Sequence, residues 1–584
     1  MRKAESVSAA LAEYPGSPEV LACAGVVQRF EWRTRVKWVV DGDRIGLYGP
    51  GHVVVDTPEC RVAPRAALEV AAILREAARR LGEGDGQARL SGVDLRVTER
   101  SEVAVVLIVE AEEGATARRL AERLAAALPE GPSAAVEGAS ARPWRVVSVA
   151  ASHRRPGAHT VLGGAPEPLR GQSVISDRIG RSTAAFPPGA FSQAHRDGAT
   201  ALHDAVLAAA GRPGTAVDLH AGTGGIAFAL AKVSRRVIAV EPFPPAADAA
   251  RRLAPRNVEV ITGRAEDAWG RQDGAGRGPG REQGFGGGRH PEGGPQRPRR
   301  EHESLRPLVL VADPPRTGLT MESIRAMVQA APDSIVMVSC DPLTLARDLD
   351  ALRSLGYAAT TPAQPLDLMP WTHHVETVVR LVPVPPEVVT TLAEDLVLAE
   401  KPALLPTIPH PEWPDSLLDR VRRAVSPELQ AAHRLDVGTS GLVVFSPRGS
   451  QVLLGAEKTY RAWVRGITRR KGHLTMPLDE DGRSVPASTH FHRLRVVAGH
   501  SLVEATLGTG RRHQLRRHFA AIGHPILGDA RYGDPRTNAY VYARHGLFRP
   551  FLHAERLALP DGHVFESSLA PDLAAALARA EAES

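Results

Sequence analysis

Runs of hydrophobic residues divide the chain into regions with different expected secondary structure. In the first part, runs of β-branched residues at 53–55 and 103–109 predict strands, since such side chains favour extended backbone. The apolar residues of 117–128 recur at helical spacing and predict an amphipathic helix. We therefore expect a mixed α+β region over residues 1–165.

From residue 166 the pattern changes to strands that alternate with helices, which is typical of a parallel α/β sheet. A Gly-, Pro- and Arg-rich stretch at 271–304 interrupts this pattern. Because this stretch has too few apolar residues to bury a core, we expect a disordered insert. The pattern resumes with an apolar strand at 307–311, and we expect the α/β domain to extend over 166–384.

A proline-rich segment at 382–386 marks a second boundary, since prolines so close together favour an extended linker. Mixed strands and helices follow to the last residue. The sequence therefore predicts a C-terminal α+β domain over residues 385–584.

Composition excludes several classes of protein. The chain has 584 residues, of which 43% are hydrophobic and 24% charged, as in folding, soluble proteins. It contains no apolar run of membrane-spanning length, and its first residues form no apolar signal segment, so we expect a cytoplasmic protein. Its three cysteines are too few for a disulfide scaffold or for a four-cysteine metal site.

The basic residues are unusual because only six of the 72 Lys and Arg residues are Lys. The net charge is +6 and the pI is about 9.4. Guanidinium groups bind phosphate in a bidentate manner, which makes a nucleic acid a natural partner. A GC-rich coding bias accounts equally well for the arginines, so composition leaves both interpretations open.

A glycine-rich turn at 217–225 follows a short strand signal and precedes an apolar helix. Glycines at a helix N-terminus let the backbone approach a ligand closely. About twenty residues later a second predicted strand ends at Glu241, where a carboxylate is placed to accept hydrogen bonds from ribose hydroxyls. Together these features favour a doubly wound, Rossmann-like nucleotide-binding sheet.

Four further blocks indicate a specific family. They are Phe-Ser-Gln-Ala-His at 191–195, Ala-Asp-Pro-Pro-Arg-Thr-Gly-Leu at 312–319, Val-Ser-Cys-Asp-Pro at 338–342, and the segment 367–377, which contains Thr-His-His-Val-Glu. With the glycine-rich turn, their order and spacing resemble the S-adenosylmethionine-dependent RNA 5-methyluridine methyltransferases of the TrmA and RlmC/RlmD type. The resemblance covers about residues 20–381.

The resemblance implies a role for each matching residue. Cys340 is the expected nucleophile, which adds to C6 of uracil so that C5 can attack a methyl group, and Glu376 is the expected base, which removes the C5 proton. Asp313 is expected where cofactor and uracil meet. The residues expected in the cofactor pocket are Gln193, Asp218, His220, Gly222, Glu241 and Asp313. The alternatives are a buried core cysteine at 340 and a strand-surface carboxylate at 376.

The chain departs from the family in its cysteines. Cys60 lies where many members place an iron–sulfur ligand, and only Cys23 stands near it in the sequence. Two cysteines cannot supply the four thiolates of such a cluster, so we expect no iron–sulfur cluster. His195 replaces the asparagine of the family's Phe-x-Gln-x-Asn block. We expect no metal at His373 and His374, since adjacent residues on a strand point to opposite faces.

The C-terminal region carries a second set of motifs. Its first block, His-Arg-Leu-Asp-Val-Gly-Thr-Ser-Gly at 433–441, is followed by Lys-Thr-Tyr-Arg-Ala-Trp at 458–463 and Gly-Arg-Arg-His-Gln-Leu-Arg at 510–516. Residues 390–570 thus resemble the RluA-type pseudouridine synthases. The resemblance implies an α+β domain with a central mixed or antiparallel sheet, and a reaction that needs no cofactor.

The resemblance makes Asp436 the essential carboxylate of this second site. The target base must leave its stack, and Tyr460 offers a ring face for it. Arg434 is expected to fill the vacated space in the RNA, and Arg516, or else Arg511, to pair with Asp436 and keep it ionised. His513 and His524 are expected to hold structure.

The sequence therefore predicts a monomeric, bifunctional enzyme that methylates C5 of one uridine and isomerises another to pseudouridine in rRNA or tRNA. Two alternatives remain. In the first, only the synthase is active and the methyltransferase half is a degraded RNA-docking platform. In the second, the chain is a non-catalytic RNA chaperone with a basic surface.

Overall fold

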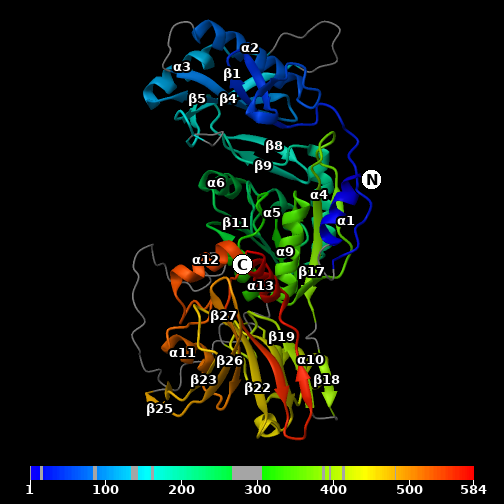
Figure 1. Cartoon of the computed structure of the whole chain (residues 1–584). Helices are drawn as coiled ribbons and strands as arrows, with labels where there is room; N and C mark the ends of the chain where they lie inside the picture. The colour runs from blue at the N-terminus through cyan, green and yellow to red at the C-terminus, as the bar shows by residue number, and fades with distance from the viewer. Residues whose placement is uncertain are drawn as a thin grey trace. The chain divides into compact units, whose positions relative to one another are not determined.

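The computed structural model describes residues 2–12, 17–82, 88–132, 143–158, 164–265, 306–384, 388–392, 396–410, 413, 415–480 and 482–583. The insert expected at 271–304 lies outside the described residues, as does part of the expected linker. The chain divides into two compact units (Figure 1). Unit 1 comprises Met1–Gly318, Asp333–Ala346 and Ala359–Leu381, and unit 2 comprises Leu319–Pro332, Arg347–Ala358 and Val382–Ser584.

The first sheet of unit 1 is seven-stranded, with the order β3-β2-β1-β4-β5-β6-β7. Its strands are β1 (Arg35–Asp41), β2 (Arg44–Tyr48), β3 (Val54–Asp56), β4 (Ala88–Val97), β5 (Glu102–Ala111), β6 (Arg145–Arg154) and β7 (Glu167–Gly171). Only β5 and β6 pair in parallel. Strand β5 confirms the strand expected at 103–109. Strand β3 overlaps the strand expected at 53–55 but begins and ends one residue later.

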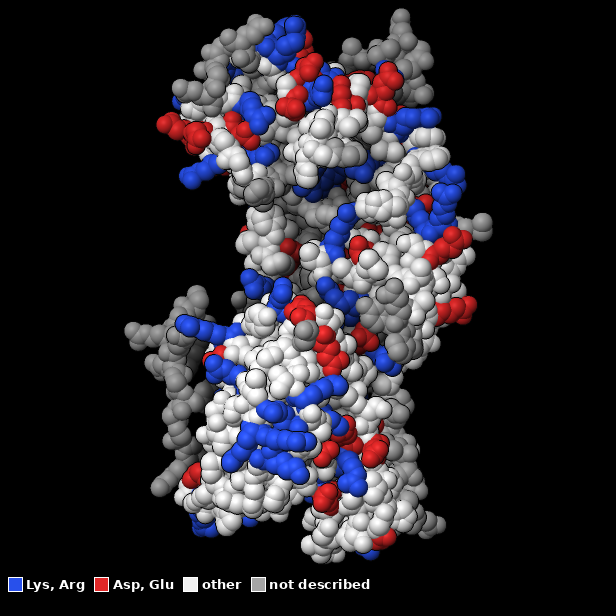
Figure 2. All heavy atoms as spheres, viewed as in Figure 1, with Lys and Arg blue, Asp and Glu red and all other residues white. Residues whose placement is uncertain are grey.

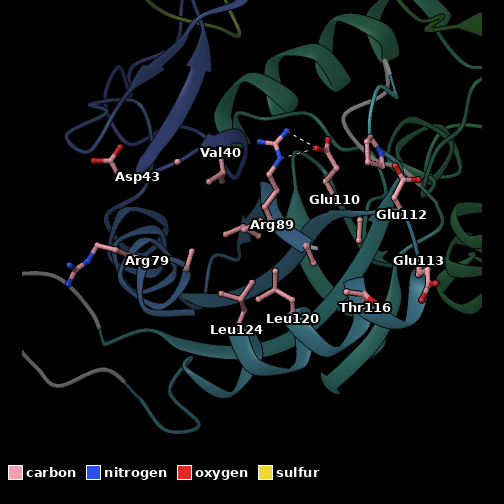
Figure 3. Close-up of a pocket in the computed structure, with 16 residues that line it drawn as sticks. Val40, Asp43, Arg79, Arg89, Glu110, Glu112, Glu113, Thr116, Leu120 and Leu124 are labelled. Atoms are coloured by element: carbon pink, nitrogen blue, oxygen red, sulfur yellow. Dashed lines mark hydrogen bonds and ion pairs between the residues drawn. The ribbon is translucent and has the colours of Figure 1, made fainter. Parts of the chain in front are cut away.

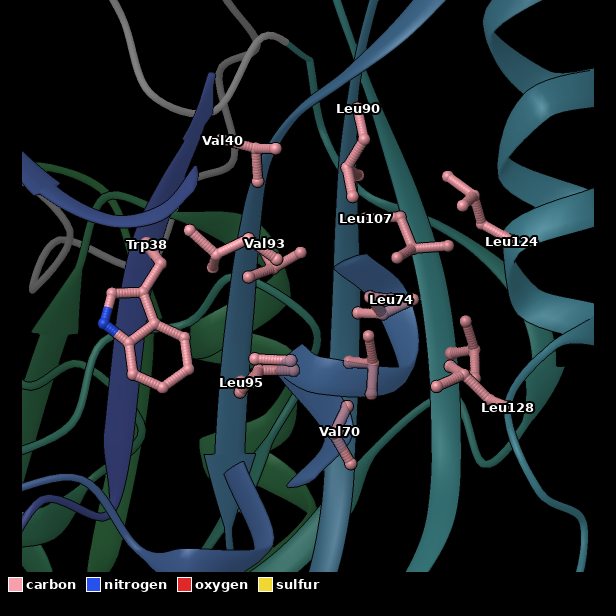
Figure 4. Packing of buried hydrophobic residues seen from close by; sticks show 14 of the residues in the cluster. Trp38, Val40, Val70, Leu74, Leu90, Val93, Leu95, Leu107, Leu124 and Leu128 are labelled. Atoms are coloured by element: carbon pink, nitrogen blue, oxygen red, sulfur yellow. The ribbon is translucent and has the colours of Figure 1, made fainter. Parts of the chain in front are cut away.

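Two amphipathic helices, α2 (Arg65–Gly82) and α3 (Gly114–Ala126), pack on this sheet. Helix α3 confirms the helix expected near 117–128. The apolar faces of both helices bury Val70, Leu74 and Leu124 against Leu107 and its neighbours on the strands (Figure 4). The N-terminal part of the chain therefore has the mixed α+β structure that the sequence predicts.

A cavity of about 830 Å³ lies in the same region, lined by strand residues and by the two helices (Figure 3). Leu120 and Leu124 of α3 form part of its apolar wall, and an ion pair between Arg89 and Glu110, 2.7 Å apart, lies at its polar side. None of the sequence motifs described above contributes a residue to this cavity.

The second large sheet, most of whose residues are assigned to unit 1, has the order β12-β11-β10-β13-β14-β17-β15, with β16 beside β17. Its strands are β10 (Thr215–Asp218), β11 (Arg236–Glu241), β12 (Val258–Thr262), β13 (Leu308–Ala312), β14 (Ser334–Ser339), β15 (Tyr357–Ala359), β16 (Gln364–Leu366) and β17 (Glu376–Pro383). The strands from β12 to β14 are parallel, and β17 is antiparallel to β14. The order reverses direction at β10, as in the doubly wound fold that the sequence predicts.

Helices of unit 1 alternate with the strands of this sheet. They are α4 (Arg196–Ala210), α5 (Gly225–Leu230) and α6 (Pro244–Leu253). The near-continuous apolar strands form one core with α4 and α5, as expected for a parallel sheet covered by helices. The helix α1 (Arg2–Ala12) and the hairpin of β8 (Ile175–Ile179) and β9 (Ser182–Phe186) complete the unit.

Unit 2 contains a ten-stranded sheet with the main order β18-β19-β21-β28-β22-β27-β26-β23. Its strands are β18 (Val388–Leu392), β19 (Leu396–Lys401), β20 (Gln430–Ala431), β21 (Ser440–Ser446), β22 (Glu457–Val464), β23 (Lys471–Leu474), β26 (Thr489–Val497), β27 (His500–Leu507), β28 (Leu552–Ala558) and β29 (Val564–Glu566). All neighbours are antiparallel except β21 and β28. This confirms the expected α+β domain with a mixed sheet.

The helices of unit 2 are α8 (Met321–Gln329), α9 (Pro342–Ser354), α10 (Leu417–Ala424), α11 (Gln514–Ala521), α12 (Pro535–His545) and α13 (Pro571–Ala582), with the first residues of α9 assigned to unit 1. Side chains alternate along β22, so Tyr460 and Trp463 lie in different cores. Trp463 packs with α12 and α13 on one face of the sheet. On the other face, Tyr460 packs with α11 and with the loops of the second motif set.

Basic side chains gather over the part of unit 2 where β22, β23 and β26 lie (Figure 2). Lys471 and Arg495 are exposed residues of these strands. Among the residues that the structure describes, no helix combines the length and the hydropathy needed to cross a bilayer.

Candidate active sites

The glycine-rich turn of unit 1 connects β10 to α5. Gly222 has a φ of 54° and Gly224 a φ of 94°, in the left-handed region that glycine tolerates best. A Cβ atom placed on Gly222 would meet no other heavy atom within 4 Å. Because the backbone at Gly222 borders open space, a ligand could approach this turn closely.

Asp218, the last residue of β10, is fully buried. Burial raises the pKa of its carboxyl group to about 7, and the nearby Asp313 carboxylate adds to the shift. Backbone N–H groups of His220 and Ala227 favour its charge, but neither oxygen accepts a hydrogen bond of normal geometry from the described protein. Buried carboxyl groups ordinarily accept at least one hydrogen bond of normal geometry, and Asp218 accepts none from the described protein.

Glu241 ends β11 beside the same turn, as the sequence predicts. Its Oε2 accepts a hydrogen bond from the Gly222 N–H at 2.8 Å, and its Oε1 accepts one from the Phe243 N–H at 2.9 Å. Burial raises the pKa of the carboxyl group, whereas these two bonds oppose the shift. Glu241 thus fixes the shape of the turn, a contribution that its strand-end position did not reveal.

Cys340 follows β14 directly and precedes α9. The pairing of β14 with β17 sets Ser339 opposite Thr377, so Cys340 and Glu376 are the next residues along the two antiparallel strands. Asp341 accepts hydrogen bonds from the N–H groups of Leu343 and Thr344, both at 3.0 Å, and so caps the start of the helix. The register of the sheet therefore brings the predicted nucleophile to the predicted base.

Asp313 follows β13, the strand next to β14, and completes this cluster. Gln193 donates from Nε2 to Asp313 Oδ2 at 3.4 Å, which joins the Phe-Ser-Gln block to the cluster. Burial raises the pKa of Asp313 to about 6. The cluster therefore joins residues from Gln193 to Glu376, which are 183 positions apart in the sequence.

Burial also controls the protonation of Cys340 and Glu376. It raises the pKa of the Cys340 thiol to about 11, the Glu376 carboxylate adds to the shift, and the Arg316 guanidinium opposes it. It raises the pKa of Glu376 to about 8, with a further contribution from Asp313. Glu376 Oε2 is buried and accepts no hydrogen bond within the described chain.

Arg316 and the two histidines lie beside this cluster. Arg316 Nη2 is 2.9 Å from His374 Nε2 and 3.1 Å from Nδ1. The expectation that His373 and His374 lie on opposite faces of a strand is wrong: both precede β17 in a loop, and their ring centroids are 4.1 Å apart. A loop does not impose the alternation of a strand.

His195, which stands where the family has asparagine, is buried. Its Nδ1 accepts a hydrogen bond from the Gly198 N–H at the start of α4, its Nε2 is 2.9 Å from the Gln28 carbonyl oxygen, and its ring stacks on Trp32. It therefore caps a helix and ties the segment around Gln28 to the active-site block.

Cys23 and Cys60 are free thiols, and burial raises the pKa of Cys23. Over the described ranges, no three His, Cys, Asp or Glu side chains are grouped so as to hold a metal ion.

The second site lies in unit 2, in the loop between β20 and β21. Asp436 belongs to a turn in which its carbonyl accepts from the Thr439 N–H at 2.9 Å. The buried Lys401 donates to the carbonyl oxygens of Leu405 at 2.7 Å and Val437 at 3.2 Å, which anchors the next residue of the loop. Burial lowers the pKa of Lys401 well below its ordinary value.

Arg516 on α11 pairs with Asp436. Its Nη1 lies 3.1 Å from Asp436 Oδ2, and its Nε and Nη2 donate to Asp529 at 2.7 and 2.8 Å. Arg511 instead donates from Nε to the Pro486 carbonyl oxygen at 3.1 Å. Arg516 and Arg511 were the two candidate partners of Asp436, and the structure places Arg516 beside its carboxylate.

A cavity of about 760 Å³ surrounds Asp436. The site residues that the sequence predicts for this domain all line it: Arg434, Asp436, Tyr460, Arg511 and Arg516. Tyr460 is 6% exposed, and burial together with the Asp436 charge raises the pKa of its phenol, so the hydroxyl remains protonated.

Two residues of this cavity were given no role in the site by sequence reasoning. His513, expected to be structural, has Nε2 3.7 Å from Asp436 Oδ1, and its Nδ1 is 3.0 Å from the Tyr532 hydroxyl. Its φ of 53° is rare for a residue other than glycine. Lys458 lines the cavity, and burial lowers its pKa. Both belong to the quoted blocks, but only the fold shows that they line the cavity around Asp436.

A buried polar network lies behind the Asp436 loop. Arg549 pairs with Asp572 of α13 at 2.6 Å and donates to the Gly438 carbonyl and the Ser440 hydroxyl, both at 3.0 Å. His553 Nδ1 is 2.9 Å from the same Ser440 oxygen. The C-terminal helix is thereby connected to the loop that carries Asp436.

Comparisons with known families match the regions of the two motif sets separately. Residues 303–383 match the model of the tRNA (uracil-5-)-methyltransferase family, and residues 395–521 match that of RNA pseudouridylate synthase. An uncharacterized RNA methyltransferase of Halalkalibacterium halodurans is 29% identical over 369 residues, which are 60% of this chain and 71% of that protein. One of Oceanobacillus iheyensis is 32% identical over 229 residues, 38% of this chain and 44% of that protein.

Solved structures match each part at low identity. The tRNA (uracil-54, C5)-methyltransferase of Pyrococcus abyssi, solved with S-adenosyl-L-homocysteine, is 21% identical, with a TM-score of 0.44, over 65% of this chain and 82% of that one. Human RNA pseudouridylate synthase domain containing 4 is 23% identical, with a TM-score of 0.28, over 32% of this chain and 91% of that one. The chain therefore joins a region that matches the uracil-C5 RNA methyltransferase family to a region that matches the RNA pseudouridylate synthase family.

Proposed function

We propose that this protein modifies uridines in rRNA or tRNA at two active sites. The site in unit 1 methylates C5 of a uridine with S-adenosylmethionine, and the site in unit 2 isomerises a uridine to pseudouridine. The observation that carries the first activity is the cluster of Cys340, Glu376 and Asp313. The pair of Asp436 and Arg516 in one cavity supports the second activity.

In the first reaction the Cys340 thiolate forms a bond to C6 of uracil, which makes C5 nucleophilic. C5 then takes the methyl group, Glu376 accepts the C5 proton, and the bond between sulfur and C6 breaks to release the product. Arg316 stabilises the thiolate, since its guanidinium opposes the upward pKa shift of Cys340. Glu376 needs to be ionised to act, and its unpartnered Oε2 is available to the proton.

The residues at the glycine-rich turn fit S-adenosylmethionine, which would supply an electrophilic methyl group when bound. Asp218 has two buried oxygens that accept no hydrogen bond from the described protein, so it can accept from hydroxyl or amino groups of a ligand. Gly222 offers open space at the backbone. Gln193, His220, Glu241 and Asp313 are the other residues that would hold the cofactor.

In the second reaction Asp436 acts on the ribose of the target uridine while the uracil detaches, turns and rejoins through C5. Arg516 holds the Asp436 carboxylate in position, since its guanidinium is itself fixed by the buried Asp529. Tyr460 offers its ring to the base, and the exposed Arg434 can enter the RNA and contact phosphate.

The two activities can be tested on one unmodified rRNA or tRNA transcript with single variants. Cys340→Ala should abolish 5-methyluridine and retain pseudouridine, and Asp436→Asn should do the reverse, as read by nucleoside mass spectrometry. Failure of the wild-type protein to form either nucleoside on rRNA and tRNA would refute the proposal.

The alternative, in which unit 1 only docks RNA, is distinguished by a covalent trap. With RNA that contains 5-fluorouridine, C5 carries fluorine in place of the proton, so the protein should remain attached to RNA through sulfur after methyl transfer. A wild-type adduct that Cys340→Ala does not form supports catalysis in unit 1. Equal behaviour of the two proteins supports docking alone.

A further inference from the structure

Two aromatic side chains form an exposed pair in unit 1. The rings of Phe30 and Trp371 are stacked, with centroids 5.7 Å apart and an angle of 25° between the planes. Phe30 is 42% exposed and Trp371 is 67% exposed. In a chain with only 4% aromatic residues, a stacked pair at the surface is unexpected, because burial of such rings would stabilise the fold.

The backbone holds Trp371 in this outward position. Its φ is 67°, a conformation that bulky side chains rarely adopt. The indole N–H donates to the Arg29 carbonyl oxygen at 2.9 Å, and the Thr372 hydroxyl donates to the Met369 carbonyl oxygen at 2.7 Å. The first bond therefore fixes the orientation of the indole ring, and the second stabilises the turn that carries Trp371.

Two guanidinium groups lie beside the pair. The Arg61 guanidinium lies 4.4 Å from the Phe30 ring centre, and Arg29 is exposed next to Phe30. Glu31 and Glu59 are exposed acidic residues of the same two segments. A flat aromatic surface among guanidinium groups suits a ligand that combines a planar base with phosphate.

Both segments that carry the pair lead directly into the first active site. Trp371 lies five residues before Glu376 and three before His374, which contacts Arg316. On the other segment, the Gln28 carbonyl contacts His195, two residues from Gln193. Since an extended chain spans at most about 3.6 Å per residue, Trp371 lies within roughly 18 Å of Glu376.

We propose that the Phe30–Trp371 pair is a stacking platform for one unpaired base of the RNA, a base that flanks the uridine held at Cys340. This inference rests on the proposed methyltransferase function. The more exposed ring, Trp371, offers the free face, and Arg61 and Arg29 lie near the backbone phosphates of the same strand. The platform would select single-stranded or unstacked RNA, because a base in a duplex has no free face.

The probe for this inference is a 12-nucleotide single-stranded RNA with one 5-fluorouridine among adenosines, and the measurement is its Kd. Loss of one base–aromatic contact should weaken binding roughly 5- to 100-fold in Trp371→Ala. Trp371→Phe keeps a ring and should stay much closer to wild type. Tyr540→Ala removes an aromatic ring that is 52% exposed on α12 and should leave the Kd unchanged.

A second set of probes identifies the base. Each adenosine is replaced in turn by an abasic nucleotide, and at one position the wild-type protein should lose as much affinity as Trp371→Ala loses. The affinity of Trp371→Ala itself should not fall further when that position is abasic. Equal affinity of Trp371→Ala and wild type, or full additivity at every position, would overturn the inference.

The outcomes separate this inference from the proposed function. If wild-type protein forms no Cys340-dependent adduct with any RNA, the methyltransferase proposal fails whatever Trp371 does. If the adduct forms and Trp371→Ala binds and reacts as wild type does, only the platform is refuted. S-adenosylmethionine binding by Trp371→Ala, expected to match wild type, shows that the variant is folded.

Discussion

Arg516 Nη1 lies 3.1 Å from Asp436 Oδ2, and the rest of its guanidinium group is held by Asp529. Asp529 is fully buried and also accepts from the N–H groups of Arg531 and Tyr532. Two of the three guanidinium nitrogens, Nε and Nη2, are thus bonded to Asp529, and Nη1 is directed to Asp436. The position of the Asp436 carboxylate therefore depends on a planar group with several donors.

Arg516→Lys should lower pseudouridine formation roughly 100-fold, because an ammonium group cannot bridge both carboxylates with the same geometry. The measurement is the single-turnover rate on a transcript that the wild-type protein modifies. Arg511→Lys, at the neighbouring motif arginine that bonds a carbonyl instead, should have a much smaller effect. Equal losses in both variants would contradict the assignment of Arg516 as the partner of Asp436.

Alkylation of Cys340 by iodoacetamide should be slow at pH 8 and should rise toward pH 11, since burial raises the pKa of the thiol to about 11. Glu376→Gln removes a negative charge beside the thiol, so it should lower this pKa and speed alkylation at pH 9. Arg316→Gln should slow it. Peptide mass spectrometry follows Cys340 with Cys23 and Cys60 as internal references, and no change in Glu376→Gln would contradict the coupling.

Methyl transfer should increase with pH through about 8 and continue to rise toward 11, because Glu376, with a pKa of about 8, accepts a proton only when ionised and Cys340, with a pKa of about 11, attacks only as the thiolate. The profile of kcat/KM in the free enzyme is the relevant measurement. Pseudouridine formation by the same protein serves as a control, because it does not use Glu376. A methylation profile that is already flat above pH 6 would show that Glu376 is not the base.

Asp218→Asn should stabilise unit 1 at pH 8 and have little effect near pH 4. The pKa of Asp218 is about 7 in the fold and about 3.9 in an unfolded chain, so the folded protein loses stability as pH rises between these values. The shift sets an upper bound of roughly 4 kcal/mol on the gain in the free energy of unfolding.

Urea unfolding of both proteins at the two pH values measures this difference. Asp204→Asn is the matched control, since a hydrogen bond from Arg181 lowers the pKa of that exposed carboxyl and the substitution should not stabilise the protein. Weaker binding of S-adenosylmethionine by Asp218→Asn is expected as well. Equal stability of Asp218→Asn and wild type at pH 8 would argue against a strained, unpartnered carboxyl.

Arg549→Leu should destabilise unit 2 by about 3–5 kcal/mol, because it leaves the Asp572 carboxylate, whose side chain is only 8% exposed, without its partner. The double variant Arg549→Leu/Asp572→Leu should recover part of this loss. Guanidinium chloride unfolding gives the double-mutant cycle. Strictly additive effects would show that the two side chains act independently of each other.

Short contiguous motifs were the part of the sites that the sequence could predict. The blocks around Cys340, Glu376 and Asp436 contain these residues in order, and the strand that ends at Glu241 follows from an apolar run, as β11 confirms. The alternation of strands and helices likewise indicated the doubly wound sheet. These features are local, so a single sequence contains them.

Contacts between distant segments could not be predicted in the same way. The strand-end position of Glu241 suggested a ligand contact, but it did not reveal that both oxygens also accept hydrogen bonds from N–H groups of the turn. His513 looked structural, yet it lies 3.7 Å from Asp436 Oδ1. His373 and His374 were expected on a strand, and the chain forms a loop there instead.

The sequence by itself determined the candidate site residues and the two fold classes that hold them, because motif, periodicity and residue type are properties of neighbouring positions. Tertiary structure alone decided which of two arginines meets Asp436, how far burial shifts the pKa of Cys340, Glu376 and Asp218, and that Phe30 stacks on Trp371. Each of these depends on the pairing of segments and on the loss of solvent around a group, and both arise only when the chain is folded.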